Sequence, residues 1–175
     1  METAPARAGA RIVRDFGLQH FSTGDLLRAE VKAGTETGKK CEALMAEGKL
    51  VPMEVTIALL REAMLKSENK KFLIDGFPRA LDQAVAFEDA IMPCSYILYF
   101  DCPLETMEAR LLKRGETSGR SDDNLEAIKK RFDTFTSQSL PVVEHYEKVG
   151  KARKISSVPP PDEVYVEVQK AFRAA

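Results

Sequence analysis

The residues best suited to chemistry follow a short apolar run. Phe72–Ile74 ends at Asp75, a glycine turn leads to Arg79, and a helical pattern begins at Ala80. In open α/β sheets, ligands bind beyond the carboxyl ends of the strands. A carboxylate at that position can hold Mg²⁺ through water beside phosphate groups. We therefore predict that Asp75 and Arg79 belong to a site. The alternative is a capped turn with a surface arginine.

Arginines form the second chemical pattern. Four of them bracket a glycine-bearing loop, and two more lie near the starts of helical patterns: Arg110, Arg114, Arg120, Arg131, Arg28 and Arg79. A guanidinium group keeps its charge and donates two parallel hydrogen bonds, so several together suit a polyphosphate. Each one alone is more readily a solvated surface charge, because charged residues are mostly exposed.

A helix start supplies a third anion-binding candidate. Ser22–Arg28 reads STGDLLR, and Thr23 is predicted to cap a helix that begins at Gly24. The first turn of a helix favours anions, and Arg28 follows one turn later. Thr23 can cap this helix and also contact a ligand.

Composition limits the class of protein. The chain has 175 residues, 44% of them hydrophobic, and a net charge of −1, which fits a single domain. The net charge gives no reason to expect nucleic acid or a membrane surface as a partner. Cysteines number three and lack metal-ligand spacing. We expect a reducing, cytoplasmic location.

Periodicity and turn residues predict the elements that position these residues. We expect strands over 18–21, 72–75 and 96–100 and a short one near Ile155. The predicted helices cover 8–16, 24–34, 36–47, 52–66, 80–91 and 103–113, and the last begins at Pro161. Residues 114–124 are predicted to be a mobile surface loop, with Asp123 and Glu126 forming a capping box. Strands that alternate with helices indicate a three-layer α/β/α sandwich with a parallel sheet.

Four motifs together resemble a known family. They are STGDLLR at 22–28, GKLVP at 48–52, FLIDGFPR at 72–79 and KRGETSGRSDDN at 113–124. The chain is similar to the adenylate kinases of the short-lid, cytosolic type from about Ala10 to its end. This resemblance implies reversible transfer of a phosphoryl group from Mg²⁺-ATP to AMP, giving two ADP, by a monomeric protein. It implies a monophosphate-binding helical part at 24–53 and a short lid at 114–124.

The resemblance also implies roles for individual residues. Arg114, Arg120 and Arg131 resemble the arginines that hold the phosphates during transfer. Arg110 and Pro159 resemble residues near the ATP adenine, and Asp75 the carboxylate that holds Mg²⁺ through water. The AMP site is implied for Thr23, Arg28, Lys49, Leu50, Val51, Gly76, Phe77, Pro78, Arg79, Gln83, Arg120 and Arg131.

Two residues bear on which base the monophosphate substrate carries. Related UMP/CMP kinases usually have Ala where Thr23 stands and Asn where Gln83 stands. A glutamine amide offers both a donor and an acceptor to the adenine edge. Gln83 therefore favours AMP, and UMP/CMP kinase is the alternative.

The N-terminal segment departs from the family. Adenylate kinases begin with a buried strand and a G-x-x-x-x-G-K phosphate loop. Residues 1–9 read METAPARAG, which contains one glycine and no lysine. We expect little catalysis from these 175 residues, since even one lost transition-state donor costs about 10²- to 10³-fold in rate.

The absent strand would be the central one of the sheet. The strands over 72–75 and 96–100 should therefore lose their partner, unless they close up or another chain fills the gap. A truncated product, or a non-catalytic relative that binds AMP or a protein, remains the competing interpretation.

Overall fold

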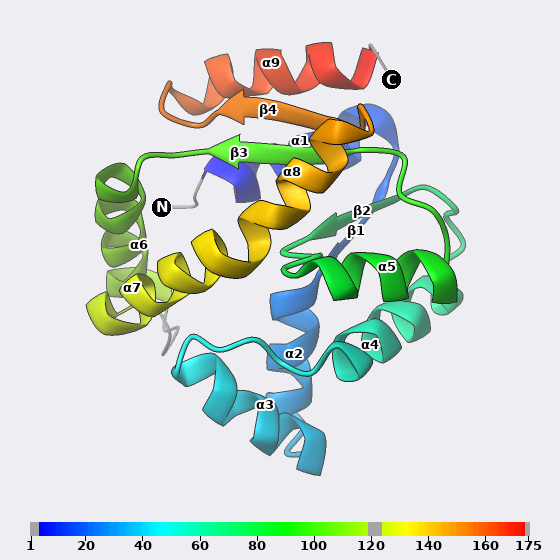
Figure 1. The fold of residues 1–175 in the computed structure, drawn as a ribbon, viewed down its shortest axis with the longest axis vertical. Coiled ribbons are helices and arrows are strands. Elements are labelled where there is room, and N and C mark those ends of the chain that lie inside the picture. The colour runs from blue at the N-terminus through cyan, green and yellow to red at the C-terminus, as the bar shows by residue number, and fades with distance from the viewer. Residues whose placement is uncertain (1–3, 119–123, 174–175) are drawn as a thin grey trace.

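Four short strands and the helices between them form the described part of the chain, shown in Figure 1. The computed structural model describes residues 4–118 and 124–173. The strands are β1 (Gln19–Ser22), β2 (Phe72–Asp75), β3 (Ile97–Asp101) and β4 (Ala152–Ser156). The helices are α1 (Ala4–Phe16), α2 (Thr23–Lys32), α3 (Glu36–Ala46), α4 (Met53–Lys66), α5 (Leu81–Ala90), α6 (Leu104–Ser118), α7 (Leu125–Thr134), α8 (Leu140–Lys148) and α9 (Pro161–Arg173), with a π-helical turn, η1 (Phe135–Ser139), joining α7 to α8.

The strands pair in parallel, which confirms the predicted α/β class. They form two separate sheets, β1 with β2 and β3 with β4. Gln19 lies opposite Phe72 in the first sheet, and Ile97 lies opposite Ala152 in the second. The two strands expected to lose a central partner, β2 and β3, have not closed up into one sheet.

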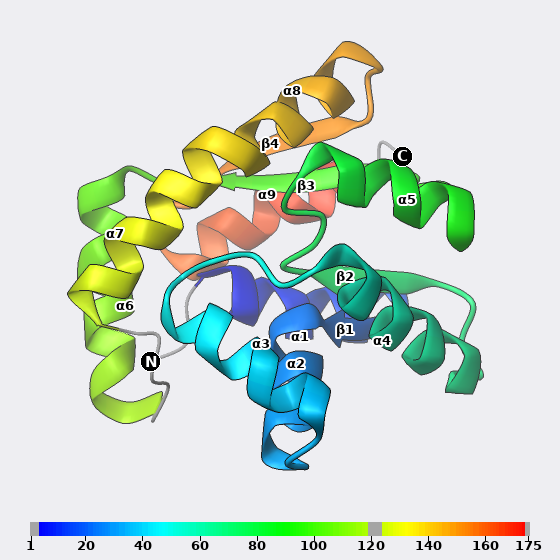
Figure 2. The same cartoon turned by 60° about the horizontal axis from the view of Figure 1, so that its bottom comes forward.

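Helices cover both faces of the strands. On one face, α1 and α9 pack against Leu73 of β2 and against Leu98 and Phe100 of β3. On the other face, α4 and α5 pack against Phe72 and Ile74, and α5 and α8 pack against Ile97. Figures 1 and 2 show the resulting layers. The three-layer arrangement is therefore present, although its middle layer is divided.

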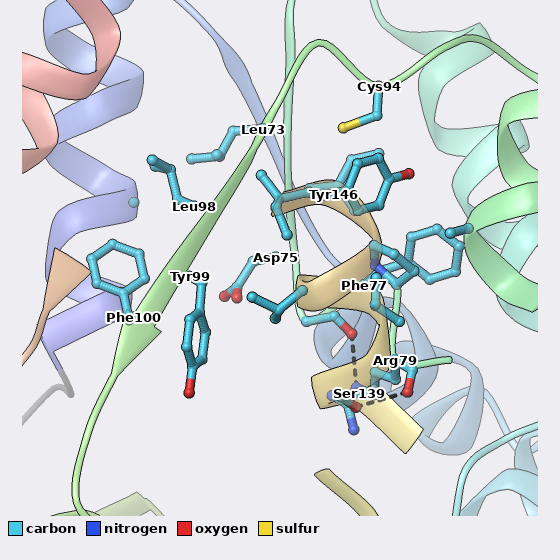
Figure 3. Close-up of a pocket in the computed structure, with 18 of the residues that line it drawn as sticks. Leu73, Asp75, Phe77, Arg79, Cys94, Leu98, Tyr99, Phe100, Ser139 and Tyr146 are labelled. Atoms are coloured by element: carbon cyan, nitrogen blue, oxygen red, sulfur yellow. Dashed lines mark hydrogen bonds between the residues drawn. The ribbon is translucent and has the colours of Figure 1, made fainter. Parts of the chain in front are cut away.

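A cavity of about 890 Å³ lies where the middle layer is divided. Residues of both β2 and β3 line it, together with apolar side chains from both helical layers. Figure 3 shows Leu73 and Leu98 close together with Phe100 beyond them, on the side of the cavity toward α1. Protein interiors are close-packed, and their few voids are seldom larger than a water molecule. A space of this size between two strands is therefore a major feature of the fold.

Two local predictions about helix starts were wrong. Ser22, not Thr23, caps α2, because Ser22 has the extended backbone and its hydroxyl accepts from the Asp25 N–H. Thr23 is the first helical residue of α2. The side chain of Asn124 caps α7 by accepting from the Ala127 N–H. The capping residue predicted for that helix, Asp123, lies outside the described ranges.

The predicted loop over 114–124 is also corrected. Helix α6 continues through Arg114 to Ser118, so the first part of that segment is helical. Residues 115–118 allow the helix to continue because no proline interrupts them. The rest of the expected lid, residues 119–123, lies outside the described part of the chain.

Polar contacts connect α1 to α9. The Tyr165 hydroxyl donates to Asp15 at 2.7 Å, and Arg11 pairs with Asp162 at 2.6 Å. The hydrogen bond from Arg14 and then that from Tyr165 lower the pKa of Asp15 to about 2. Burial, followed by the bond to Asp15, raises the pKa of Tyr165 to about 12. These contacts hold the N-terminal helix on the core.

We predict that Tyr165→Phe lowers the free energy of unfolding at pH 7, since Asp15 then loses a hydrogen bond to its charged form. A carboxyl whose folded pKa is depressed contributes stability above its unfolded pKa, near 3.9, and loses it as the pH falls through about 2. The difference between wild type and variant should therefore shrink below about pH 4. Urea unfolding between pH 7 and pH 3 measures it. In an Asp15→Asn background, Tyr165→Phe should show no such pH dependence.

Candidate functional site

A second cavity, of about 530 Å³, collects most of the predicted site residues. It lies between the start of α2, the segment before α4, the turn after β2 and helix α7. Twelve predicted residues line it: Thr23, Arg28, Lys49, Leu50, Val51, Asp75, Gly76, Phe77, Arg79, Gln83, Arg114 and Arg131. The fold thus brings together residues that are more than 100 positions apart in the sequence.

The start of α2 forms one wall of this cavity. Thr23 is only 3% exposed, and its hydroxyl lies 3.1 Å from the carbonyl oxygens of both Asp75 and Gly76. Arg28 lies one turn later and pairs with Asp25 on the same helix. The Thr23 hydroxyl therefore ties the N-terminus of α2 to the end of β2, which places an anion-favouring helix start beside the strand end.

The turn after β2 forms the opposite wall and orders its own side chains. The Arg79 Nε donates to the Gly76 carbonyl at 2.7 Å, and the Arg79 N–H donates to Gln83 Oε1 at 2.9 Å. Ser139 of η1 donates to the Arg79 carbonyl at 2.7 Å, as Figure 3 shows. Because Gln83 is only 6% exposed and its oxygen is oriented by Arg79, its Nε2 amino group remains as a positioned donor.

Gly76 is required at this turn for two reasons. Its φ of +74° lies in the left-handed region, which residues with a side chain rarely adopt. A Cβ at this position would lie 3.0 Å from Thr23 Oγ1 and 3.1 Å from Arg79 Nη2. Both walls of the cavity therefore approach each other at Gly76, where there is no side chain between them.

The segment over 48–51 closes a third side. Gly48 has a φ of +69° and packs so closely on α7 that a Cβ would lie 3.2 Å from Arg131 Cγ. Thr134 of α7 also donates to the Gly48 carbonyl at 3.4 Å. This contact places the backbone of 49–51 beside Arg131, while Val51 is anchored in a small core with Leu27.

Four predicted residues do not line this cavity. Arg110 donates to the carbonyls of Ser157 at 2.6 Å and Val158 at 3.1 Å. It therefore lies with Pro159 at the loop after β4, where the two form a separate group. Pro78 lines the larger cavity instead, and Arg120 lies outside the described ranges.

Asp75 stands at the carboxyl end of β2, and its side chain is 50% exposed. His20 Nε2 lies 3.8 Å from its carboxylate. Among residues 4–118 and 124–173, no group of three or more His, Cys, Asp or Glu residues could hold a metal ion. Magnesium is commonly held by one or two carboxylates, with water and substrate phosphates completing its ligands. A single exposed carboxylate beside an arginine-lined cavity fits that mode.

Sequence reasoning missed three polar residues near the cavities. His20 is not among the predicted site residues, yet it lines both cavities. Thr56 of α4 is 7% exposed and lines the smaller cavity. A threonine within an apolar helical face was the available signal. Ser139 supports Arg79 from a distance of 60 residues, and nothing in the local sequence indicates that contact.

The parallel strands, the helix start at the strand end and the converging arginines define an α/β protein with a candidate site for phosphorylated ligands. Comparison with known proteins specifies the family. The family model described as "Adenylate kinase" matches residues 6–151. The chain belongs to the adenylate kinase family, whose members are nucleotide-binding phosphotransferases of the nucleoside monophosphate kinase type.

Relatives carry names of two substrate classes. "UMP-CMP kinase 3" of Oryza sativa subsp. japonica is 52% identical, with 93% of this chain and 77% of the relative covered. "Uridylate kinase" of Saccharomyces cerevisiae is 48% identical, covering 93% and 82%. "Adenylate kinase 1" of Schistosoma mansoni is also 48% identical, covering 90% and 81%.

None of the described helices is long and apolar enough to cross a membrane.

We predict that Gly76→Ala destabilises the protein by more than Gly17→Ala does. Gly17 has a φ of +65° with nothing within 4 Å of an added Cβ, so its substitution should cost only backbone strain, about 1–2 kcal/mol. Gly76→Ala adds displacement of Thr23 and Arg79 to the same strain. Urea unfolding measures both costs. Equal losses in the two variants would contradict the close approach at Gly76.

Proposed function

We propose that the smaller cavity binds AMP. The observation that carries this proposal is the turn over 76–83, where one short segment presents a guanidinium group and a buried amide. The phosphate of AMP would lie against the positive charge of Arg28, Arg79 and Arg131. The adenine would lie toward Gln83, whose amide offers a donor and retains acceptor capacity. Thr23, at the start of α2, would contact the base side of the site.

The remaining arginines act in phosphoryl transfer under this proposal. Transfer of a phosphoryl group depends on alignment and on positive charge around the group that moves. Arg114 on α6 and Arg131 on α7 line the same cavity, and Arg120 would join them from the segment outside the described ranges. Arg110 and Pro159 would face the adenine of ATP at the loop after β4. Mg²⁺, held by Asp75 through water, would neutralise charge on the phosphates.

UMP and CMP form the second candidate substrate class. Two of the three relatives above carry names that refer to uridylate or UMP and CMP. Gln83 is the residue that favours AMP, because its longer amide can reach the adenine edge. We further infer a monomer that acts in the cytoplasm, with residues 24–53 as its monophosphate-binding part.

Calorimetric titration with AMP, UMP and CMP tests the choice of base. We expect the lowest Kd for AMP, and we expect Gln83→Ala to weaken AMP binding about tenfold, since one buried hydrogen bond contributes roughly 0.5–1.5 kcal/mol. Gln138→Ala is the matched control, because Gln138 is exposed on η1. Tighter binding of UMP or CMP than of AMP would contradict AMP as the substrate and would support UMP or CMP instead.

Catalysis by these 175 residues is expected to be very weak. They contain no G-x-x-x-x-G-K sequence, and such a loop supplies several backbone donors to the phosphates at once. We predict that purified chain forms ATP from ADP at least 10³-fold more slowly than a family member with the loop. A coupled assay for ATP measures this rate. AMP binding with no turnover supports the proposal as stated, whereas turnover at a family rate contradicts the predicted need for the loop.

A further inference from the structure

The buried side chains that line the smaller cavity carry no charge. They belong to Thr23, Leu27, Val51, Thr56 and Gln83, whereas the lining arginines are only partly buried. Ligand sites commonly combine an apolar lining with a few polar groups that fix the orientation of the ligand. A nucleotide would therefore place its uncharged base against the buried side chains and its phosphate toward the arginines.

Two of the three buried polar side chains already have protein partners. The Thr23 hydroxyl has one proton, which is directed at the carbonyl oxygens of Asp75 and Gly76, each 3.1 Å away. Gln83 Oε1 accepts from the Arg79 N–H at 2.9 Å, which leaves the Nε2 amino group as the donor. Both side chains are thus oriented by the protein, and Gln83 presents an amino group to the ligand.

Thr56 is the third, and its hydroxyl has no hydrogen bond to any residue that the structure describes. Threonines inside helices can donate to the carbonyl four residues earlier. Thr134 and Thr136 do so, at 2.9 and 3.0 Å. The corresponding carbonyl for Thr56, that of Pro52, accepts the Thr56 backbone N–H at 3.4 Å instead. The Thr56 hydroxyl therefore keeps both its proton and its lone pairs for another partner.

This hydroxyl is accessible from the cavity. Among the described residues, only the Tyr96 hydroxyl is a buried side-chain group that is shut off from solvent and lacks a hydrogen bond. The Thr56 oxygen is therefore not shut off, and Thr56 lines the cavity from the buried face of α4. Burying a hydroxyl that makes no hydrogen bond costs free energy. A ligand that supplies the missing bond offsets that cost.

We propose that Thr56 selects the base by a hydrogen bond to its exocyclic group, which in AMP is the 6-amino group. This inference rests on the proposed AMP site. The Thr56 hydroxyl oxygen accepts from the 6-amino group, while the Gln83 amino group donates to a ring nitrogen. The two residues together recognise a base that has an amino group beside a ring acceptor. A purine without the amino group loses one of the two contacts.

Two ligands that differ in one group test this role. Calorimetric titration compares AMP with purine riboside 5′-monophosphate, which has hydrogen in place of the 6-amino group. Thr56→Val replaces the hydroxyl with a methyl group of similar size. We expect it to weaken AMP binding about fivefold, the effect of one hydrogen bond, and to leave binding of the analogue unchanged. Thr56→Ser keeps the hydroxyl and should restore most of the affinity for AMP.

Unfolding of the ligand-free protein gives a second measurement. Because the Thr56 hydroxyl is buried without a partner, Thr56→Val should raise the urea midpoint while it weakens AMP binding. Thr136→Val is the matched control, since Thr136 is exposed and its hydroxyl is bonded to the Phe132 carbonyl. It should leave AMP affinity unchanged and should not raise the midpoint. A lower midpoint in Thr56→Val would indicate a structural hydroxyl and contradict the proposal.

Failure of this proposal can be told apart from failure of the AMP site. Equal weakening of both ligands by Thr56→Val, or no weakening of either, would overturn the role of Thr56 while AMP binding to the wild type stands. Absence of AMP binding to the wild type would overturn both proposals. Loss of AMP affinity alone, with rescue by Thr56→Ser, is the result that supports selection of the base by Thr56.

Discussion

The pairing of strand backbones is the constraint on which the rest of this structure depends. A buried backbone N–H or C=O group without a partner costs free energy comparable to a lost hydrogen bond. β2 and β3 are each paired on one edge only and share a cavity of about 890 Å³ on the other. The divided middle layer is therefore the part of the fold that most needs a partner.

The nucleotide site depends on the same strand. β2 ends at Asp75. After the Gly76 turn, the Arg79 N–H donates to Gln83, and the Ser139 hydroxyl donates to the Arg79 carbonyl. Thr23 joins this turn to the start of α2. The candidate monophosphate side is thus held by side-chain contacts at the end of β2 and not by pairing between β2 and β3. This separation is why AMP binding and phosphoryl transfer can be proposed independently for one chain.

Sequence reasoning selected twelve of the residues that line the smaller cavity, but fewer of the residues that support them. The change from an apolar run to a glycine turn over 72–79 is a local signal that predicted Asp75 and Arg79, and the family resemblance added Gln83. Capping was less predictable, since Ser22 and Thr23 are both good caps and only the backbone angles and the bond to Asp75 distinguish them. Arg114 was expected in a loop and lies in α6, because no residue there interrupts the helix.

The sequence by itself determined the order of strands and helices, the family motifs and the absence of a phosphate-loop sequence, since each is written in adjacent residues. Only the tertiary structure decided that β2 and β3 stay apart, because their separation depends on side chains from α1, α5, α8 and α9 that pack from both faces. It also decided that Arg110 lies with the loop after β4 and that Ser139 supports Arg79. These contacts join positions 47 to 60 residues apart, and no local pattern specifies them.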